Sequence, residues 1–200
     1  MRLILFVTIS MLLSSCGTYR FNKNSDFGII SDLSELNGTY RNEPQISKKG
    51  WEIGMIRLFF STKEIVAYNA GNNEMMAYNI DIDLVAIRKE IEQIMDTVTL
   101  RFLDNNTLLV SCLINETVFS KEFKGKKKKK YFEIYYKKEK LIIPLIYSNI
   151  DVYRLRIGRY KKTNDLLIRN LSESSVSILF IGVAADAGER PYVYKRIVEN

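Results

Sequence analysis

The second half of this 200-residue chain is a series of short apolar segments, many with a two-residue period. Turn-forming residues separate them about every eight to twelve positions, the spacing of strands in all-β sandwiches and barrels. We count about nine such strands from Thr97 onwards and one or two before it. The segments are TVTLRFL, TLLVSCLI, TVFSKEF, YFEIYY, LIIPLIY, DVYRLRIG, DLLIRNL, SVSILFIGV and PYVYKRIV. Their number and hairpin connections predict a mainly β fold, an antiparallel meander barrel whose closure leaves no unpaired edge.

Two segments ahead of these strands have a helical spacing instead. Between residues 82 and 96, Leu84, Ile87, Ile91 and Ile94 recur at intervals of three and four, and charged residues lie mainly on the other faces. This pattern predicts one amphipathic helix, which we expect to pack on the core and not on a partner. Residues 50–60 (GWEIGMIRLFF) also fit a helix, with a strand as the alternative because part of their spacing is two.

Alternation along the strands indicates which side chains face the barrel interior. Cys112 lies between Val110 and Ile114 on an apolar face, so we interpret it as a small buried hydrophobe and not as a reactive thiol. Packed side chains are the default filling of a small barrel, and a small apolar ligand is the alternative. The residues expected to face the interior, or such a ligand, are Cys112, Phe132, Ile134, Tyr136, Tyr153, Leu155 and Ile157.

The first fifteen residues have the parts of an export signal. Arg2 supplies a positive start, and residues 3–13 form an apolar stretch that is too short for the ~20 residues of a membrane span. The sequence Leu13-Ser14-Ser15-Cys16 resembles the lipobox of bacterial lipoproteins. This resemblance implies cleavage before Cys16 and acyl chains attached to it, which would hold the chain stably at a membrane.

The predicted order of segments is a signal peptide over residues 1–15, a lipidated flexible tether over 16–35 and one β domain over 36–200. The tether is expected because this stretch is polar and lacks periodicity. Gly17 follows the cysteine, which in the enteric sorting pattern implies the outer membrane. We therefore expect a lipid-anchored protein of the bacterial cell envelope. A plain secretory signal with a chance cysteine, or an N-terminal amphipathic helix of a cytosolic protein, are the alternatives.

The start and end of the β domain resemble those of lipocalin-like (calycin) domains. Leu36-Asn37-Gly38-Thr39-Tyr40 looks like their opening strand, in which an aromatic residue after Gly-x plugs one end of the barrel. Tyr192 to Ile197 is similar to the last strand of these domains. Arg196 matches a basic residue of the family that stacks on the plug. Tyr40 stands where the family has Trp. The alternative is that Tyr40 and Arg196 are strand-end residues without a special role.

The net charge of +7 is concentrated at one place in the sequence. Lys124 and residues 126–130 supply six of the 30 basic residues and Arg2 one more, which leaves 23 basic against 23 acidic residues. A nucleic-acid partner is not expected, because such proteins spread positive charge over a face. Phe119 and Phe123 precede the run and apolar residues follow it, so it is expected to form the tip of a β-hairpin, with Gly125 permitting the turn. This tip is either a solvated loop or a contact for anionic lipid or an envelope protein, through Lys126, Lys127, Lys128, Lys129 and Lys130.

The sequence offers no catalytic motif. It has no histidine, and two cysteines are too few for a thiolate zinc site, so no enzyme activity, cofactor or metal is expected. Two functions follow from the remaining features. The first is a membrane-anchored lipocalin-like domain that binds a small, apolar ligand. The second is a non-enzymatic interaction or structural protein of the envelope that binds a macromolecular partner through its surface.

Overall fold

The computed structural model describes residues 26–47, 53–60, 96–114, 117–144, 146–179 and 181–197. A short 3-10 helix opens the described part and one α-helix follows the first strand. The elements are η1 (Leu33–Leu36), β1 (Gly38–Ile46), α2 (Met55–Phe59), β2 (Thr97–Phe102), β3 (Thr107–Ile114), β4 (Thr117–Lys127), β5 (Phe132–Ile143), β6 (Tyr147–Arg159), β7 (Leu166–Ile178) and β8 (Ile181–Ile197).

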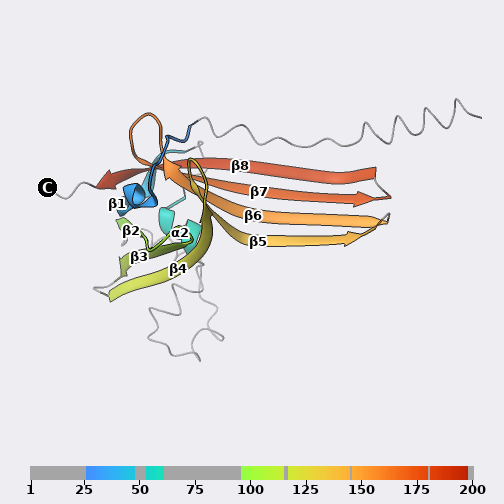
Figure 1. Ribbon diagram of the computed structural model, residues 1–200, viewed down its shortest axis with the longest axis horizontal. Coiled ribbons are helices and arrows are strands. Elements are labelled where there is room, and N and C mark those ends of the chain that lie inside the picture. The colour runs from blue at the N-terminus through green and yellow to red at the C-terminus, as the bar shows by residue number, and fades with distance from the viewer. Residues whose placement is uncertain are drawn as a thin grey trace, which may run out of the picture.

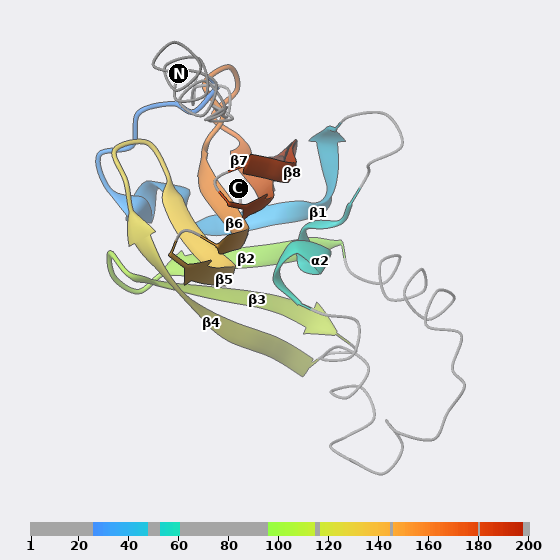
Figure 2. The same ribbon diagram turned by 90° about the vertical axis from the view of Figure 1, so that its right-hand side faces the viewer.

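The eight strands form one closed antiparallel barrel, which confirms the predicted fold class. Each strand pairs with the next along the chain, and β1 pairs with β8 to close the ring (Figure 2). The described part contains seven strands after Asp96, fewer than the nine expected, because several segments join into long strands. In β5, for example, YFEIYY continues through KKEK into the next apolar segment without a turn.

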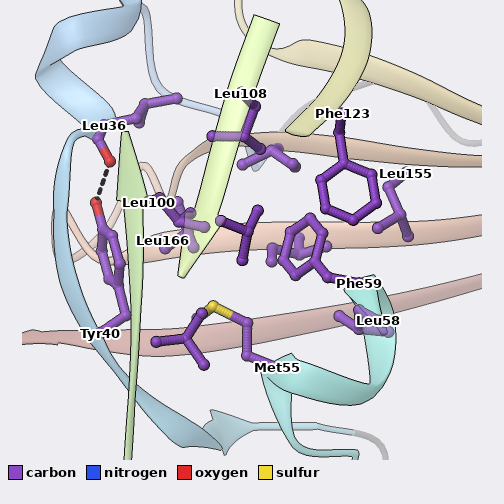
Figure 3. Close-up of a cluster of buried hydrophobic side chains, with 14 of the residues drawn as sticks. Leu36, Tyr40, Met55, Leu58, Phe59, Leu100, Leu108, Phe123, Leu155 and Leu166 are labelled. Atoms are coloured by element: carbon purple, nitrogen blue, oxygen red, sulfur yellow. Dashed lines mark hydrogen bonds between the residues drawn. The ribbon is translucent and has the colours of Figure 1, made fainter. Parts of the chain in front are cut away.

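Helix α2 lies inside the barrel and fills it. Met55, Ile56, Leu58 and Phe59 are between 0% and 8% exposed and belong to the main core. Figure 3 shows Met55, Leu58 and Phe59 packed against residues of several strands. The predicted helix near residues 50–60 is therefore present over Met55–Phe59. The predicted helix over residues 82–96 lies outside the described residues, apart from Asp96 immediately before β2.

Hydrogen bonds from the strands fix α2 in this position. The side-chain oxygen of the buried Asn42 accepts a hydrogen bond from the Ile56 amide at 2.9 Å, which satisfies one of the amides that a helix start leaves without a partner. The Tyr194 hydroxyl donates to the carbonyl of Ile53 at 2.9 Å. At the other end, the Tyr136 hydroxyl donates to the carbonyl of Leu58 at 2.7 Å. Polar groups from three strands thus hold a five-residue helix that would not be stable alone.

Four strands continue well beyond the closed ring. Pairing between β4 and β5 is confined to Gly125–Lys127 and Phe132–Ile134, and pairing between β1 and β8 reaches no further along β8 than Val193. The strands β5–β8 nevertheless stay paired with one another to their ends. Figure 1 shows the result, a four-stranded sheet that projects to the right of the barrel. We call this projection the arm, residues 136–143, 147–153, 172–178 and 181–188.

The folded part of the chain includes residues that we expected in the tether. Phe27 forms an isolated bridge with Tyr160 and packs on the outer face of the barrel with Leu167 and Val193. Ile30 is 4% exposed and belongs to the main core. The chain therefore enters the fold near the turn between β6 and β7, at the end of β6 opposite to the arm.

Candidate functional site

The far end of the arm carries the densest group of exposed apolar side chains on the described strands β5–β8. We call this group the tip. Its members are between 44% and 60% exposed: Leu141, Ile142, Ile143, Ile146, Ile178 and Leu179. The Leu179 amide donates to the carbonyl of Ile146 at 2.8 Å, so a hydrogen bond joins the turns after β5 and β7. Six large aliphatic side chains at one extremity exceed the scattered apolar exposure that is normal on a surface.

Leu179 has an unfavourable backbone conformation at the end of the arm. Its φ is 50°, in the left-handed region, and Ile178 pairs with Ile181 to enclose a two-residue turn. Hairpin turns of this length usually carry Asn or Gly at positive φ, because a branched side chain costs about 1–2 kcal/mol there. The sequence instead places leucine at this turn, and the leucine is 60% exposed. Neither local stability nor solubility accounts for this residue.

A band of charged residues separates the tip from the barrel. Lys137 on β5 contacts Asp151 at 2.6 Å and Glu139 at 3.0 Å. These hydrogen bonds, first of all the one to Asp151, raise the pKa of Lys137 to about 12. In the strand register, Glu139 pairs with Asp151, Asp151 with Ser174, and Ser174 with Asp186. Beyond this row Lys140 is the last charged residue of the arm.

A polar recess lies between this band and the mouth of the barrel. It has a volume of about 260 Å³ and is lined by Tyr153, Asn170, Ser172, Ser174, Asp186, Gly188 and Arg190. A side chain at Gly188 would fill part of it, because an added Cβ would lie 2.8 Å from the Ser172 hydroxyl. Hydroxyl, amide and charged groups dominate its lining, so it is unsuited to the apolar ligand that we expected for the barrel.

The other end of the barrel brings together the two residues expected to form a plug. The guanidinium carbon of Arg196 lies 6.0 Å from the centre of the Tyr40 ring, within the range of a cation–π contact. Arg196 also donates to the backbone carbonyls of Glu35 and Asn37, and the Tyr40 hydroxyl donates to the carbonyl of Leu36 at 2.8 Å (Figure 3). Burial raises the pKa of Tyr40 to about 12. A second hollow of about 590 Å³ lies beside Arg196 at this end.

The lysine run forms a hairpin at the same end of β5 as this plug, away from the tip. Lys126 and Lys127 are paired within β4, and the Lys128 amide donates to the Tyr131 carbonyl at 2.7 Å to close the turn. Lys128 and Lys129 are exposed. Gly125 does not form the turn as we expected. It lies within β4, where an added Cβ would be 2.5 Å from the Phe132 ring, so close packing requires glycine.

Five of the seven residues predicted to face the interior belong to one packed core. They are Cys112, Phe132, Ile134, Leu155 and Ile157, each at most 5% exposed. Tyr136 and Tyr153 lie at the barrel mouth instead, at 45% and 44% exposure. A register shift between Tyr135 and Lys137 interrupts the alternation that we followed along β5. The side chains of α2 complete the core, so in the described part the interior is occupied by protein.

Burial makes Cys112 an unreactive thiol and raises its pKa from the usual 9.0 to about 11. At pH 8 the thiolate fraction is therefore expected to be about 100-fold lower in the folded than in the unfolded chain. A Cys16→Ser chain should react with a thiol reagent at least this much faster in urea than in buffer. Equal rates would contradict the burial. Because ionisation favours the unfolded chain, Cys112 should also lower stability as pH rises from about 9 towards 11.

The tip was not identified from the sequence, although a signal for it is present. Residues 141–150 and 174–185 contain no charged residue, and each range spans a hairpin turn, where polar residues are usual. We assigned the segments LIIPLIY and SVSILFIGV within these ranges to strands of the barrel. Only the register of β5–β8 shows that the two runs end side by side and outside the barrel.

The fold and the arm define a protein class in structural terms, a packed meander barrel with a projecting apolar-tipped sheet. No protein-family model matches the chain, and no curated protein matches it significantly. Among the described residues, no helix has the length and hydrophobicity to cross a membrane, and no group of three or more His, Cys, Asp or Glu residues is placed to hold a metal ion.

Proposed function

We propose that this chain is an exported, lipid-anchored and non-enzymatic interaction protein of the bacterial cell envelope, whose arm contacts another envelope component. The observation that carries the proposal is the tip, six exposed aliphatic side chains on a sheet that the barrel does not need for closure. An apolar group of this size at an extremity is typical of a binding surface. Its exposure costs solubility, so a contact that covers it is its most direct explanation.

The packed interior favours this proposal over binding of an apolar ligand inside the barrel. Met55 and Ile56 of α2 are fully buried there, and Phe59 lies 5.3 Å from Phe123, measured between ring centres. A ligand in this space would have to displace α2 and break its hydrogen bonds to Asn42 and Tyr136. Both hollows described above lie outside this core.

The anchor is proposed from Cys16, and Asp26, ten residues further along the chain, belongs to the fold. Asp26 lies near the turn between β6 and β7, where its carbonyl accepts a hydrogen bond from the Lys161 amide at 2.9 Å. The exposed Lys128 and Lys129 occupy the same end of β5 and β6. A chain held by its N-terminal segment would thus direct basic residues towards its own membrane, where anionic lipids attract them.

Crosslinking in intact cells tests the proposed contact. A photoreactive amino acid at Ile142 in the tip is expected to yield covalent adducts. The same probe at Leu113, an exposed residue of β3 on the barrel, is the matched control and should yield few. Equal yields at the two positions, or none at Ile142, would contradict the proposal that the arm is the contact surface.

Metabolic labelling with an alkyne fatty acid tests the anchor separately. Label is expected on the native chain and absent from the Cys16→Ser chain. Most of the Cys16→Ser chain should also be lost from the membrane fraction, because stable anchoring depends on two acyl signals. Label that persists after this substitution would show that Cys16 is not the acylated residue.

A further inference from the structure

We propose that the tip inserts into the surface of a lipid bilayer. This inference rests on the proposed function, because it names the component that the arm contacts. The tip consists of aliphatic side chains on two sheet faces and at two turns, and the charged band above it limits how far it can enter.

Apolar residues lie on both faces of the arm's end and at its two turns, although Ile142 shares its row with the hydrogen-bonded Ser148 and Ser177. Leu141 and Ile143 project from one face of β5, and Ile142 projects from the other, because side chains alternate along a strand. Ile146 and Leu179 occupy the two neighbouring turns, which a hydrogen bond joins. A protein partner usually covers one face of a sheet, whereas lipid can surround an extremity. The distribution of these residues therefore fits a bilayer better than a flat protein surface.

The tip is also small for a stable protein interface. Such interfaces bury about 800 Å² on each side, and the tip has six aliphatic side chains that are each only about half exposed. Two tips packed end to end would fall well short of this size. Insertion into lipid has no corresponding minimum area, because each apolar side chain that leaves water contributes by itself.

The leucine at the strained turn supports the same conclusion. An asparagine at Leu179 would relieve the positive φ and would suit a two-residue hairpin turn. Leucine adds local strain and exposes an aliphatic side chain at the outermost point of β7. An aliphatic side chain that enters a bilayer leaves water, and the free energy of its burial then offsets the cost of exposing it.

The charged band restricts insertion to a shallow depth. Between the turns and the row of Glu139, Asp151 and Asp186 there are about four residues of each strand, or ~13 Å at 3.3 Å per residue. This length exceeds the ~5–10 Å by which apolar segments enter the interface of a bilayer, so the outer part of each strand can insert before the charged row reaches the headgroups. Shallow insertion also keeps the unpaired edges of β5 and β8 near water, which a fully buried open sheet could not. Lys140 can extend its ammonium group to the headgroups.

The band itself is nearly neutral, so headgroup charge should matter little. Lys137, Lys138 and Lys140 are offset by the acidic residues Glu139, Asp151, Glu173 and Asp186 on the same strands. Insertion is therefore expected in vesicles of phosphatidylcholine as well as in vesicles of phosphatidylethanolamine with phosphatidylglycerol. It should also be insensitive to salt, because it depends on apolar burial.

Fluorescence of a label in the tip tests the inference. The full chain carrying Cys112→Ala and Ile142→Cys is purified from membranes, labelled with an environment-sensitive fluorophore and reconstituted in these vesicles. The tip and the chain entry lie at opposite ends of β6, so the tip can insert either into the bilayer that holds the anchor or into a different one. Nitroxide lipids are therefore placed in the reconstituted vesicles in one experiment and in a second, added set of vesicles in another. Quenching by nitroxides about 5–10 Å below the headgroups is expected from one of the two sets. A chain without Ile142→Cys, treated in parallel, reports any label at Cys16.

Two double variants provide the controls. Ile146→Asn with Leu179→Asn is expected to abolish nitroxide quenching without loss of stability, because asparagine suits the turn. Leu103→Asn with Leu113→Asn changes two similarly exposed leucines of the barrel and should leave quenching unchanged. Equal loss in both double variants would contradict a specific role of the tip.

The remaining outcomes separate the inference from the proposed function. If iodide in water quenches the label at Ile142→Cys as strongly as a label at Lys162→Cys, the inference is overturned. Protection from iodide without nitroxide quenching would also overturn it, since protein, such as a second copy, would then cover the tip, and the proposed arm contact would stand. Nitroxide quenching by a chain whose Cys16 thiol is free would support the inference and contradict the proposed anchor.

Discussion

Replacing Phe59 by alanine is expected to lower the free energy of unfolding by about 3–5 kcal/mol. Phe59 is 2% exposed and lies inside the barrel on α2, with its ring centre 5.3 Å from that of Phe123. The substitution removes the transfer energy of a whole ring and leaves a cavity that the strands cannot collapse to fill. Since domains are stable by only about 5–15 kcal/mol, the variant is expected to be close to unfolding at 37 °C. Urea unfolding followed by circular dichroism measures the difference.

The matched control for this substitution is Leu113→Ala. Leu113 lies on β3 and is 57% exposed, so its truncation should change stability by no more than about 0.5 kcal/mol. A loss below about 1 kcal/mol for Phe59→Ala would show that α2 does not fill the interior. Hydrogen exchange adds a second readout. The Phe60 amide, which donates to the Ile56 carbonyl at 2.8 Å, should exchange as slowly as the core strands if α2 stays inside the barrel.

Local patterns predict hairpins well in this chain. Asp104-Asn105-Asn106 separates two alternating segments, which is a turn pattern, and the structure has a turn there, in which the Asp104 side chain accepts a hydrogen bond from the Asn106 amide at 2.6 Å. The lysine run was predicted to be a hairpin tip, and it closes the turn between β4 and β5. Turn residues and the alternation of the flanking strands involve residues that are close together in the sequence, so the sequence alone predicts these hairpins.

Features that depend on residues far apart in sequence were not predictable. The spacing of residues 50–60 indicated a helix, but a helical period does not tell whether the helix covers a barrel or fills it. The arm is a second example. Within Lys137–Lys140 both faces are polar, so alternation disappears and the segment resembles a turn, whereas β6 pairs with it throughout. The pairing that extends β5 is contributed by residues of β6, which β7 pairs on its other side, and the tip depends on that extension.

Neutralising Glu133 is expected to be the second largest perturbation, a loss of about 3–5 kcal/mol for Glu133→Gln. The Glu133 side chain is 4% exposed, near the start of β5 in the segment that pairs with β4. It accepts hydrogen bonds from Arg156 Nε at 2.9 Å and from the Tyr135 hydroxyl at 2.9 Å, and Arg154 lies 3.9 Å away. Glutamine keeps the volume but removes the negative charge that faces two guanidinium groups, 13% and 16% exposed, of which the Arg154 group also contacts Glu173 at 3.5 Å.

Glu139→Gln provides the matched control on the same strand. The Glu139 side chain is 69% exposed and pairs with Lys137 at 3.0 Å, so solvent screens the interaction and the loss should be at most about 1 kcal/mol. Equal losses for the two variants would contradict a buried network at Glu133. Adding Arg156→Gln to Glu133→Gln gives a double-mutant cycle, in which a coupling energy near zero would assign the loss to packing. Tyr135 and Arg154 of this network lie next to the first residues of the arm. Glu133→Gln should therefore also speed hydrogen exchange in β5 beyond Tyr135, and unchanged exchange there would limit its effect to the barrel.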